Sequence, residues 1–493
     1  MVITLSGSGP RYQQVYGAIR EGVLSGKLRA GDRLPVTRTL ARDLGMSRNV
    51  VLIAYEQLIA EGYAQARVGD GTFVAATLPD SMLPVTATRR QDSVVRPGPP
   101  RLSQYARRIL DEPDSEAPVQ PATHRRRYDF AYYLASAQDF PGDVWRRLLA
   151  RRLRSLDLDY SPVGGDAGLR TEIANYIRRS RAVDCSPDQI LLVNGSQQAI
   201  DLVARVLLDP GDSVVLEDPH YQGAREAFRS VGARIIPIPV DHSGLEVARL
   251  PRARRVRLSY VTPSHQFPTG AIMPLHRRLA LLAWAEKTGS YILEDDYDGE
   301  FRYEGRPVEA VQALDRAGRV IYAGTFSRIL FPSLRMGYVV MPPALSAALS
   351  RAKQITDRHT SFLQQAALAD FMREGYLDRS VRRSRVRNAS RRQTLLRAIG
   401  KYFGDSVEVL GAAAGIHVLL RFHGVAGRQT ARLISRAAQA GVAIYSTAPY
   451  YLKPPERCEL ILGYGALADR DITAGIRALE NAIRPLLAKN SLT

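Results

Sequence analysis

The chain has 493 residues, 45% of them hydrophobic and 24% charged, which suggests more than one globular domain. It contains no apolar run of about 18 residues, and its only cysteines, Cys185 and Cys458, lack the spacing of a disulfide framework or a zinc site. The formal charge of +19, from 68 lysines and arginines against 49 acids, favours a polyanionic partner. We therefore expect a cytoplasmic protein without a membrane partner or a bound metal.

Residues 10–76 have the pattern of three short helices followed by a hairpin. Apolar residues recur every three or four positions in each helix, and Ser47 is a favourable N-cap for the third. The short turn at Gly45 predicts a helix-turn-helix, whose second helix presents its first residues to base edges or phosphates. The inward-facing positions are predicted to be Val15, Ile19, Val23, Leu40, Leu44, Val50, Ala54 and Leu58.

The hairpin is predicted from two strands that flank Val68-Gly69-Asp70-Gly71, a typical short-loop signal. With the helices, it resembles the GntR-type winged helix over the whole domain, in segments 33–41, 47–51 and 69–74. Val36 departs from this pattern, because the family usually has a helix-capping serine there. The resemblance implies binding to double-stranded DNA through Arg38, Ser47, Arg48, Asn49 and Gly71.

Residues 77–127 differ in composition, with eight prolines and little apolar periodicity. Such a segment is extended and semi-rigid, so it is predicted to be a linker between the N-terminal domain and the rest of the chain. A short helix is predicted within it at residues 102–110.

Residues 128–493 contain short apolar runs that alternate with helical stretches, the pattern of buried strands in an α/β sheet. Polar segments follow several of these runs, at the strand ends where open α/β sheets bind ligands. The predicted strands cover residues 189–193, 213–216, 256–261, 291–293 and 320–322.

Four of the polar segments offer groups that suit a phosphorylated, planar ligand. The helix that begins at Ser196 has free N–H groups for a phosphate, and Tyr221 could lie flat on a ring. A buried acid in 294–298 could hold a protonated pyridine nitrogen, and loop 262–270 offers further hydrogen bonds. Each feature alone is also typical of ordinary packing, and the acidic loop could equally bind a metal, although no histidine pattern partners it.

The fifth segment, residues 324–337, resembles an aminotransferase active-site segment in which Arg328 stands in the place of the Schiff-base lysine. Its Ser327 and Arg335 could clamp a phosphate. A lysine can lose its proton and attack an aldehyde, whereas a guanidinium stays charged in any protein environment. Arg328 therefore cannot form the covalent link, and the base that transamination needs is missing.

In this order, and behind a GntR-type winged helix, the five segments resemble the MocR subfamily of bacterial regulators over nearly the full chain. The resemblance implies a multidomain protein that joins the winged helix to an α/β domain of the fold-type I, pyridoxal 5′-phosphate (PLP)-dependent aminotransferase class. It also implies PLP as the usual cofactor and a homodimer with exchanged N-terminal domains. Asp295 would face the pyridine nitrogen and Tyr297 the ring hydroxyl. The implied cofactor contacts are Ser196, Gln197, Tyr221, Asp295, Tyr297, Ser327, Arg328 and Arg335.

A second departure from the aminotransferase pattern is Ile461, where the enzymes carry an arginine for the substrate carboxylate. With Arg328, it favours a ligand-responsive transcription regulator, not an enzyme, that controls an operon of catabolism or amino-compound metabolism. Two interpretations of the pocket remain open: PLP or its amino-acid adduct bound without a covalent bond, or a different anion held by Arg328. The alternative functions are an active aminotransferase that carries a DNA-binding domain and a cofactor-free scaffold that dimerises the DNA readers.

Overall fold

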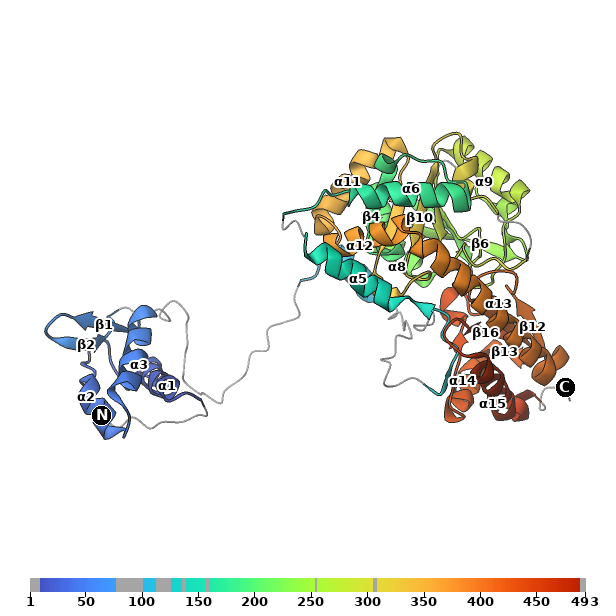
Figure 1. Cartoon of the computed structure of the whole chain (residues 1–493). Coiled ribbons are helices and arrows are strands. Elements are labelled where there is room, and N and C mark those ends of the chain that lie inside the picture. The colour runs from blue at the N-terminus through green and yellow to red at the C-terminus, as the bar shows by residue number, and fades with distance from the viewer. Residues whose placement is uncertain are drawn as a thin grey trace. The chain divides into compact units, whose positions relative to one another are not determined.

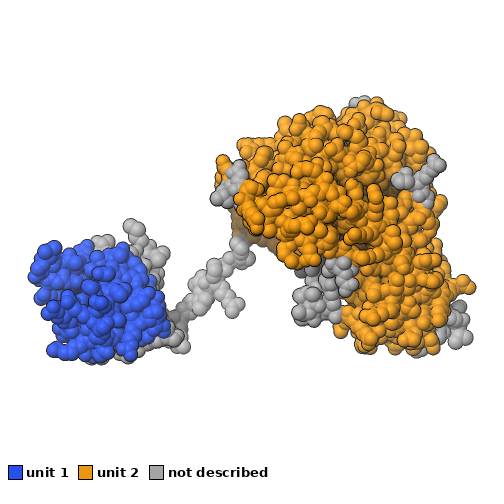
Figure 2. All heavy atoms as spheres, viewed as in Figure 1, with its two compact units in different colours: residues 1–100 blue, residues 101–493 orange. Residues whose placement is uncertain are grey.

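The computed structural model describes residues 9–76, 101–111, 126–134, 139–155, 159–252, 255–304 and 308–487. The chain divides into two compact units, residues 1–100 and residues 101–493 (Figure 2). The boundary between the units falls within the predicted linker, of which residues 77–100 and 112–125 lie outside the described residues.

The first unit contains the three helices and the hairpin that the sequence predicts. Their apolar faces enclose a small core, in which Val15, Ala54 and Leu58 are fully buried. The two strands pair antiparallel, with Arg67 opposite Gly71. The elements are α1 (Arg11–Leu24), α2 (Thr37–Asp43), α3 (Arg48–Ala60), β1 (Ala64–Arg67) and β2 (Gly71–Val74).

The buried face of α3 differs slightly from the predicted one. Val50 is only half-buried, and Val51 occupies the core position in its place, because the buried stripe of the helix continues through Ala54, Tyr55 and Leu58. The hydroxyl of Tyr55 donates a hydrogen bond of 2.8 Å to the carbonyl oxygen of Pro35. An aromatic side chain that was not predicted as core therefore ties α3 to the segment before α2.

A helix within the predicted linker belongs to the second unit. The helix predicted at residues 102–110 is present as α4 (Gln104–Asp111) and packs against α8 (Gln222–Ser230). Arg108 donates a hydrogen bond of 3.4 Å to the carbonyl oxygen of Ser230. Residues 101–111 are thus part of the large unit and not a free tether.

The second unit is built on an eight-stranded sheet in the order β4-β11-β10-β9-β8-β5-β6-β7. Strands β10, β9, β8 and β5 pair in parallel, and β11 is antiparallel to both β10 and β4, so β4 has the same direction as the parallel group. Their carboxyl ends therefore meet at one edge of the sheet, where ligands bind in this class of fold. The strands are β4 (Ile190–Val193), β5 (Ser213–Asp218), β6 (Arg234–Asp241), β7 (Gly244–Leu245), β8 (Val256–Val261), β9 (Tyr291–Asp296), β10 (Val320–Thr325) and β11 (Gly337–Val340).

Helices cover both faces of this sheet, which explains the uninterrupted apolar runs of its central strands. In β4, Leu191 and Val193 pack against the helices of one face, and Ile190 and Leu192 against those of the other. One face carries α7 (Ser196–Leu207), α8 and α11 (Pro343–Asp357), and the other carries α5 (Gly142–Leu153), α6 (Ala167–Arg181), α9 (Leu275–Thr288) and α12 (Phe362–Arg373) (Figure 1).

A smaller antiparallel sheet, in the order β12-β13-β16-β15, forms the C-terminal part of the unit. The long helix α13 joins the two parts, since its Leu377 packs in the core beside α12 and its Ile399 in the core of the small sheet (Figure 1). No described helix combines the length and apolar character that crossing a membrane requires. The elements are α13 (Tyr376–Phe403), β12 (Val407–Leu410), β13 (His417–Ala426), α14 (Thr430–Gln439), β15 (Tyr445–Ser446), β16 (Arg457–Gly463) and α15 (Asp469–Leu487).

Candidate functional site

A cavity of about 200 Å³ lies at the carboxyl edge of the large sheet. Its wall contains all eight side chains that the sequence analysis assigns to a cofactor, which reach it from the ends of β4, β5, β9 and β10. Seven further residues of the wall were not predicted as ligand contacts: Tyr132, Tyr133, Tyr260, Thr262, Phe267, Thr325 and Pro332.

One end of the cavity is lined by polar atoms that lack a partner. Ser196 begins α7, and its Oγ is buried without a hydrogen-bond partner among the described residues, as is the Oγ of Ser327. Gln197 donates from Nε2 to the carbonyl oxygen of Gly223 at 2.9 Å, while its Oε1 has no partner within the described chain. The first N–H groups of a helix also need acceptors, so this end suits an anion with several oxygen atoms.

Arg335 closes the same end from the loop after β10. It has a left-handed backbone with φ of 48°, and its Nη2 donates a hydrogen bond of 2.9 Å to the carbonyl oxygen of Asn194. A Cβ atom on Gly195 would lie 3.2 Å from the Arg335 guanidinium, so this close approach depends on glycine. A guanidinium beside a helix N-terminus provides charge and N–H donors for a phosphate.

The cavity wall also contains the buried carboxyl group of Asp295, near the end of β9. Its Oδ2 accepts a hydrogen bond of 2.8 Å from the hydroxyl of Tyr260, and its Oδ1 has no partner among the described residues. Burial raises the pKa of Asp295 to about 6. A protonated ring nitrogen would give Oδ1 its missing donor and offset the desolvation of the carboxylate.

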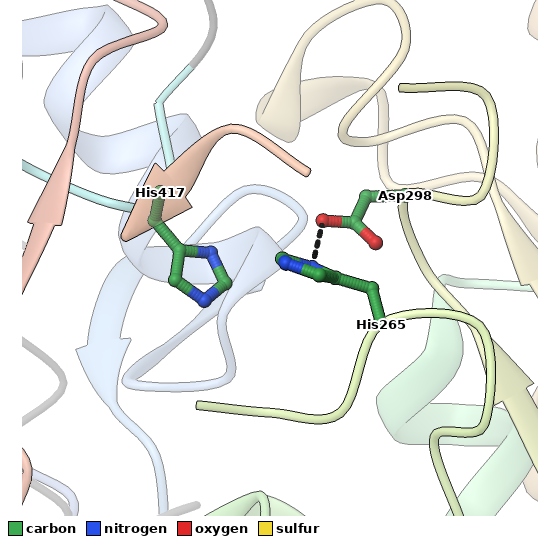
Figure 3. A group of neighbouring side chains, drawn as sticks. All are labelled: His265, Asp298 and His417. Atoms are coloured by element: carbon green, nitrogen blue, oxygen red, sulfur yellow. Dashed lines mark hydrogen bonds and ion pairs between the residues drawn. The ribbon is translucent and has the colours of Figure 1, made fainter. Parts of the chain in front are cut away.

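Tyr297 is held by a buried group of polar side chains behind the cavity wall. Its hydroxyl donates a hydrogen bond of 2.9 Å to the carbonyl oxygen of His265 and lies 3.1 Å from Nδ1 of the same residue. Asp298 Oδ2 lies 2.9 Å from that Nδ1, and the ring of His417 faces His265 with 4.8 Å between centroids (Figure 3). These contacts fix the position of the Tyr297 hydroxyl.

His265, Asp298 and His417 also place three atoms of metal-ligand type within 4.8 Å of one another (Figure 3). The sequence analysis found no histidine to partner the acidic loop, because these residues come from three distant segments that no spacing pattern connects. Burial, with the nearby His265 and Arg328, holds the pKa of His417 well below its usual range. The positive charge of Arg328 opposes a cation there, and His265 Nδ1 is already engaged by Asp298, while His265 Nε2 and Asp298 Oδ1 have no hydrogen-bond partner among the described residues.

Arg328 follows Ser327 in the chain and lies in the cavity wall near the Tyr297 ring. Its Nη1 donates a hydrogen bond of 2.8 Å to the carbonyl oxygen of Tyr132, and its guanidinium carbon lies 5.8 Å from the centroid of the Tyr297 ring. No lysine lines the cavity in the part of the chain that the structure describes. Lys353 is buried elsewhere, on α11, and forms an ion pair of 2.6 Å with Asp357.

The position at which the resemblance expects a substrate-binding arginine is apolar and closed. Ile461 is fully buried in β16 and packs with Tyr132, Phe267 and Tyr297. Arg457 lies exposed at the start of the same strand and is not part of the cavity wall. The wall therefore offers Arg328 and Arg335 as its two guanidinium groups, at different places.

Tyr221, the residue before α8, is the side chain that the sequence predicts to stack on the ring of a ligand. Its ring is 36% exposed and stands edge-on to Phe267, with centroids 6.2 Å apart and an interplanar angle of 85°. An accessible aromatic face at a cavity wall can stack on a planar ligand.

One wall residue that was not predicted, Tyr260, lies within a predicted strand. Its contact with Asp295 depends on the pairing of β8 with β9, which the sequence does not reveal.

The predicted DNA-contact residues are all exposed in the first unit. Arg38 lies in the first turn of α2, and Arg48 and Asn49 begin α3. Ser47 occupies the N-cap position of α3, but its side chain makes no capping hydrogen bond, which leaves its hydroxyl available to DNA. This placement is that of a recognition helix whose N-terminal end reaches the nucleic acid.

The hairpin carries further basic groups that were not predicted as DNA contacts. Gly71 begins β2 with φ of 123°, and a Cβ atom there would lie 3.1 Å from Nε of Arg33. The guanidinium carbons of Arg33 and Arg67 lie 5.9 and 4.6 Å from the centroid of the Phe73 ring. Stacking on one aromatic ring gathers both charges beside the wing, where they can contact phosphates.

Comparisons with known proteins match both units. Residues 11–74 match the bacterial regulatory proteins of the gntR family, and residues 132–458 match aminotransferase class I and II. The probable rhizopine catabolism regulatory protein MocR of Rhizobium meliloti is 38% identical over 100% of this chain and 97% of its own length. The HTH-type transcriptional regulator TauR of Rhodobacter capsulatus is 33% identical over 97% of each chain.

Among solved structures, the large unit is similar to the kynurenine aminotransferase of Pyrococcus horikoshii, solved in complex with PMP. The two are 29% identical with a TM-score of 0.71, and the match covers 78% of this chain and 97% of the enzyme. The large unit therefore has the fold-type I aminotransferase architecture that the sequence analysis expects, whereas the regulators match the chain over nearly its full length.

Proposed function

The chain belongs to the MocR subfamily of GntR-type transcription regulators, and on this premise we propose that its aminotransferase-like unit is a sensor that binds a phosphorylated pyridine without a covalent bond. The cavity wall carries this proposal. It presents unpaired oxygen atoms of Ser196, Ser327 and Asp295 to a phosphate and a ring, but Arg328 where a nucleophilic amine is needed.

The same wall supports a regulator in preference to an enzyme. Transamination requires a group that moves a proton on the substrate, and a guanidinium does not act as a base at neutral pH. The apolar Ile461 also leaves no cation for a substrate carboxylate at the position that the enzymes use. Recognition of the phosphorylated ring is thus retained without the groups that would perform the reaction.

For the first unit, the proposed partner is an operator in double-stranded DNA. Each chain has one winged helix, so a homodimer would place two of them on paired half-sites, and we propose the exchanged arrangement of N-terminal domains that the family resemblance implies. Ligand binding would favour one arrangement of the dimer and so alter its fit to the two half-sites. Because its proposed partner is operator DNA, we propose that the protein acts in the cytoplasm.

The proposed target is an operon of catabolism or amino-compound metabolism. The name of the Rhizobium meliloti relative supports rhizopine catabolism as one such pathway. The proposed binding of a ligand in the cavity, including the role of Arg328, is the same whichever operon is controlled.

The proposal is tested by adding PLP to the purified full-length chain. We expect stoichiometric binding by equilibrium dialysis, the absorbance of the free aldehyde, and no gain in mass after borohydride reduction. A reduced adduct on a lysine, or transfer of an amino group to a keto acid, would establish the aminotransferase alternative. Failure of every phosphorylated pyridine to bind would favour the cofactor-free scaffold.

A further inference from the structure

We propose that the cavity selects a phosphorylated pyridine whose substituent at ring carbon 4 carries a carboxylate, and that Arg328 recognises this carboxylate. The inference rests on the proposed function and names the chemical class of its ligand. It follows from the order of polar groups around the cavity and from the free donors of Arg328.

The cavity has a distinct partner for each substituent of such a ring. In the arrangement that the family resemblance implies, Asp295 would face the nitrogen, Tyr297 the ring hydroxyl on carbon 3, and Ser327 with Arg335 the phosphate attached through carbon 5, and all four residues lie in the cavity wall. Carbon 4 is opposite the nitrogen and lies between carbons 3 and 5. The group that faces its substituent must therefore lie between Tyr297 and the phosphate site.

Arg328 is the residue in that place. It follows Ser327 in the chain, and its guanidinium carbon lies 5.8 Å from the centroid of the Tyr297 ring. One nitrogen, Nη1, is anchored to the carbonyl oxygen of Tyr132 at 2.8 Å. This bond fixes the direction of the side chain before a ligand enters, which reduces the entropy lost on binding.

The donors of Arg328 that remain have no acidic partner. No carboxylate of the described residues forms an ion pair with it, whereas the buried Arg181 pairs with Asp296 at 2.5 Å and the half-buried Arg152 pairs with Asp370 at 2.5 Å. A guanidinium in a half-buried wall is best matched by a carboxylate, which accepts two parallel N–H bonds.

Other substituents at carbon 4 match this site less well. An aldehyde offers a single neutral acceptor, so it would form one weaker hydrogen bond. A protonated aminomethyl group, as in pyridoxamine 5′-phosphate, would bring a second positive charge against Arg328. The expected order of affinity is carboxylate first, then aldehyde, then amine.

Two probes that differ only at carbon 4 test this order by calorimetric titration of the full chain: 4-pyridoxic acid 5′-phosphate and pyridoxamine 5′-phosphate. We expect the carboxylate probe to bind at least about tenfold more tightly, as for one charge-assisted pair. Arg328→Gln should reduce this ratio to about threefold or less, whereas Arg328→Lys, which keeps the charge, should retain most of it. Circular dichroism checks that each variant is folded.

Arg335→Gln is the matched control, because it removes a guanidinium from the same wall at the phosphate end. It should weaken both probes by a similar factor and leave their ratio unchanged. Equal or tighter binding of the amine by the wild-type chain, or an unchanged ratio in folded Arg328→Gln, would overturn the inference and leave the proposed sensor intact. Failure of both probes and of PLP to bind would instead overturn the proposed function.

Discussion

Arg328 lies in the cavity wall, and the resemblance to aminotransferases implies that an amine able to lose its proton belongs at its position. Its neighbours remain suited to a phosphate and a pyridine ring, since Ser196, Ser327 and Asp295 keep polar atoms without partners among the described residues. On the proposed function, Arg328 and Ile461 together separate binding of the ring from chemistry on it.

Reintroducing the amine should restore a covalent link. In Arg328→Lys, we expect added PLP to produce the absorbance band of a lysine–aldehyde link and a mass increase after borohydride reduction, because the remaining contacts of the cavity are unchanged. The control Arg328→Gln should show neither signal. A variant with lysine that binds PLP only reversibly would mean that position 328 does not face the aldehyde.

Asp295 makes ligand affinity depend on pH. Its raised pKa of about 6 leaves the carboxyl group protonated below that pH and ionised above it. Only the ionised form attracts a protonated ring nitrogen, so affinity should rise as the pH increases from 5 to 7. The ligand phosphate also titrates near pH 6, so the measurement compares wild type with Asp295→Asn. The variant should bind more weakly at pH 7 and show a smaller dependence on pH, and equal curves would contradict the assigned role of Asp295.

The sequence predicts which residues at the strand ends line the cavity better than it predicts the contacts between distant segments of the chain. Asp295 and Tyr221 could be placed on the wall because acids and aromatics at the ends of apolar strands share one edge of a parallel sheet. Tyr132 could not, since it reaches the cavity from a segment far from the sheet strands in the chain and carries no local pattern. The approach of His417 to His265 likewise depends on how the small sheet packs against the large one.

At the scale of elements, the phosphate end depends on the turn between β4 and α7. Gly195 has φ of 82° and lets the Arg335 guanidinium approach within 3.2 Å of the place of a Cβ atom. Gly195→Ala should lower stability by about 1 to 3 kcal/mol through backbone strain, and should also weaken phosphate binding by displacing Arg335. Thermal unfolding and calorimetry with pyridoxamine 5′-phosphate measure the two effects.

Gly211 provides the matched control for this substitution. It also has a positive φ, of 96°, but a Cβ atom there would meet nothing within 4 Å. Gly211→Ala should therefore lower stability without changing ligand affinity. If both alanine variants bind the probe as tightly as the wild type does, the turn before α7 is not part of the ligand site.

The elements that could be predicted from the sequence are mainly those that are buried. Strands β4, β5, β8, β9 and β10 could be recognised because helices cover both faces of the sheet and most of their central positions are apolar. Strand β6, whose Pro237 and Pro239 are unusual in a strand, was not predicted, nor were the strands of the small sheet, although β13 and β16 each contain an apolar run of three residues. In α3, the predicted core residue Val50 is wrong by one position. The neighbouring Val51 is equally apolar, and it is the one that is buried.

At the scale of the whole molecule, DNA binding should depend on the first residues of α3 and not on net charge alone. Arg48→Ala should weaken binding to a preferred duplex by about tenfold or more, in line with the loss of one good base or phosphate contact. Arg432, exposed on α14 of the large unit, offers a control with the same change of charge. Arg432→Ala should have little effect, and equal losses in the two variants would indicate attraction by total charge.

The central claim is that binding of a small molecule by the aminotransferase-like unit changes the affinity of the winged helix for DNA. The most direct test is fluorescence anisotropy of the full-length protein, at fixed salt, on a duplex that it selects from a random-sequence pool, with and without saturating 4-pyridoxic acid 5′-phosphate. We expect a change in DNA affinity of about fivefold or more, which Arg335→Gln should reach only at higher ligand concentrations. An unchanged affinity while the ligand is bound would contradict the claim.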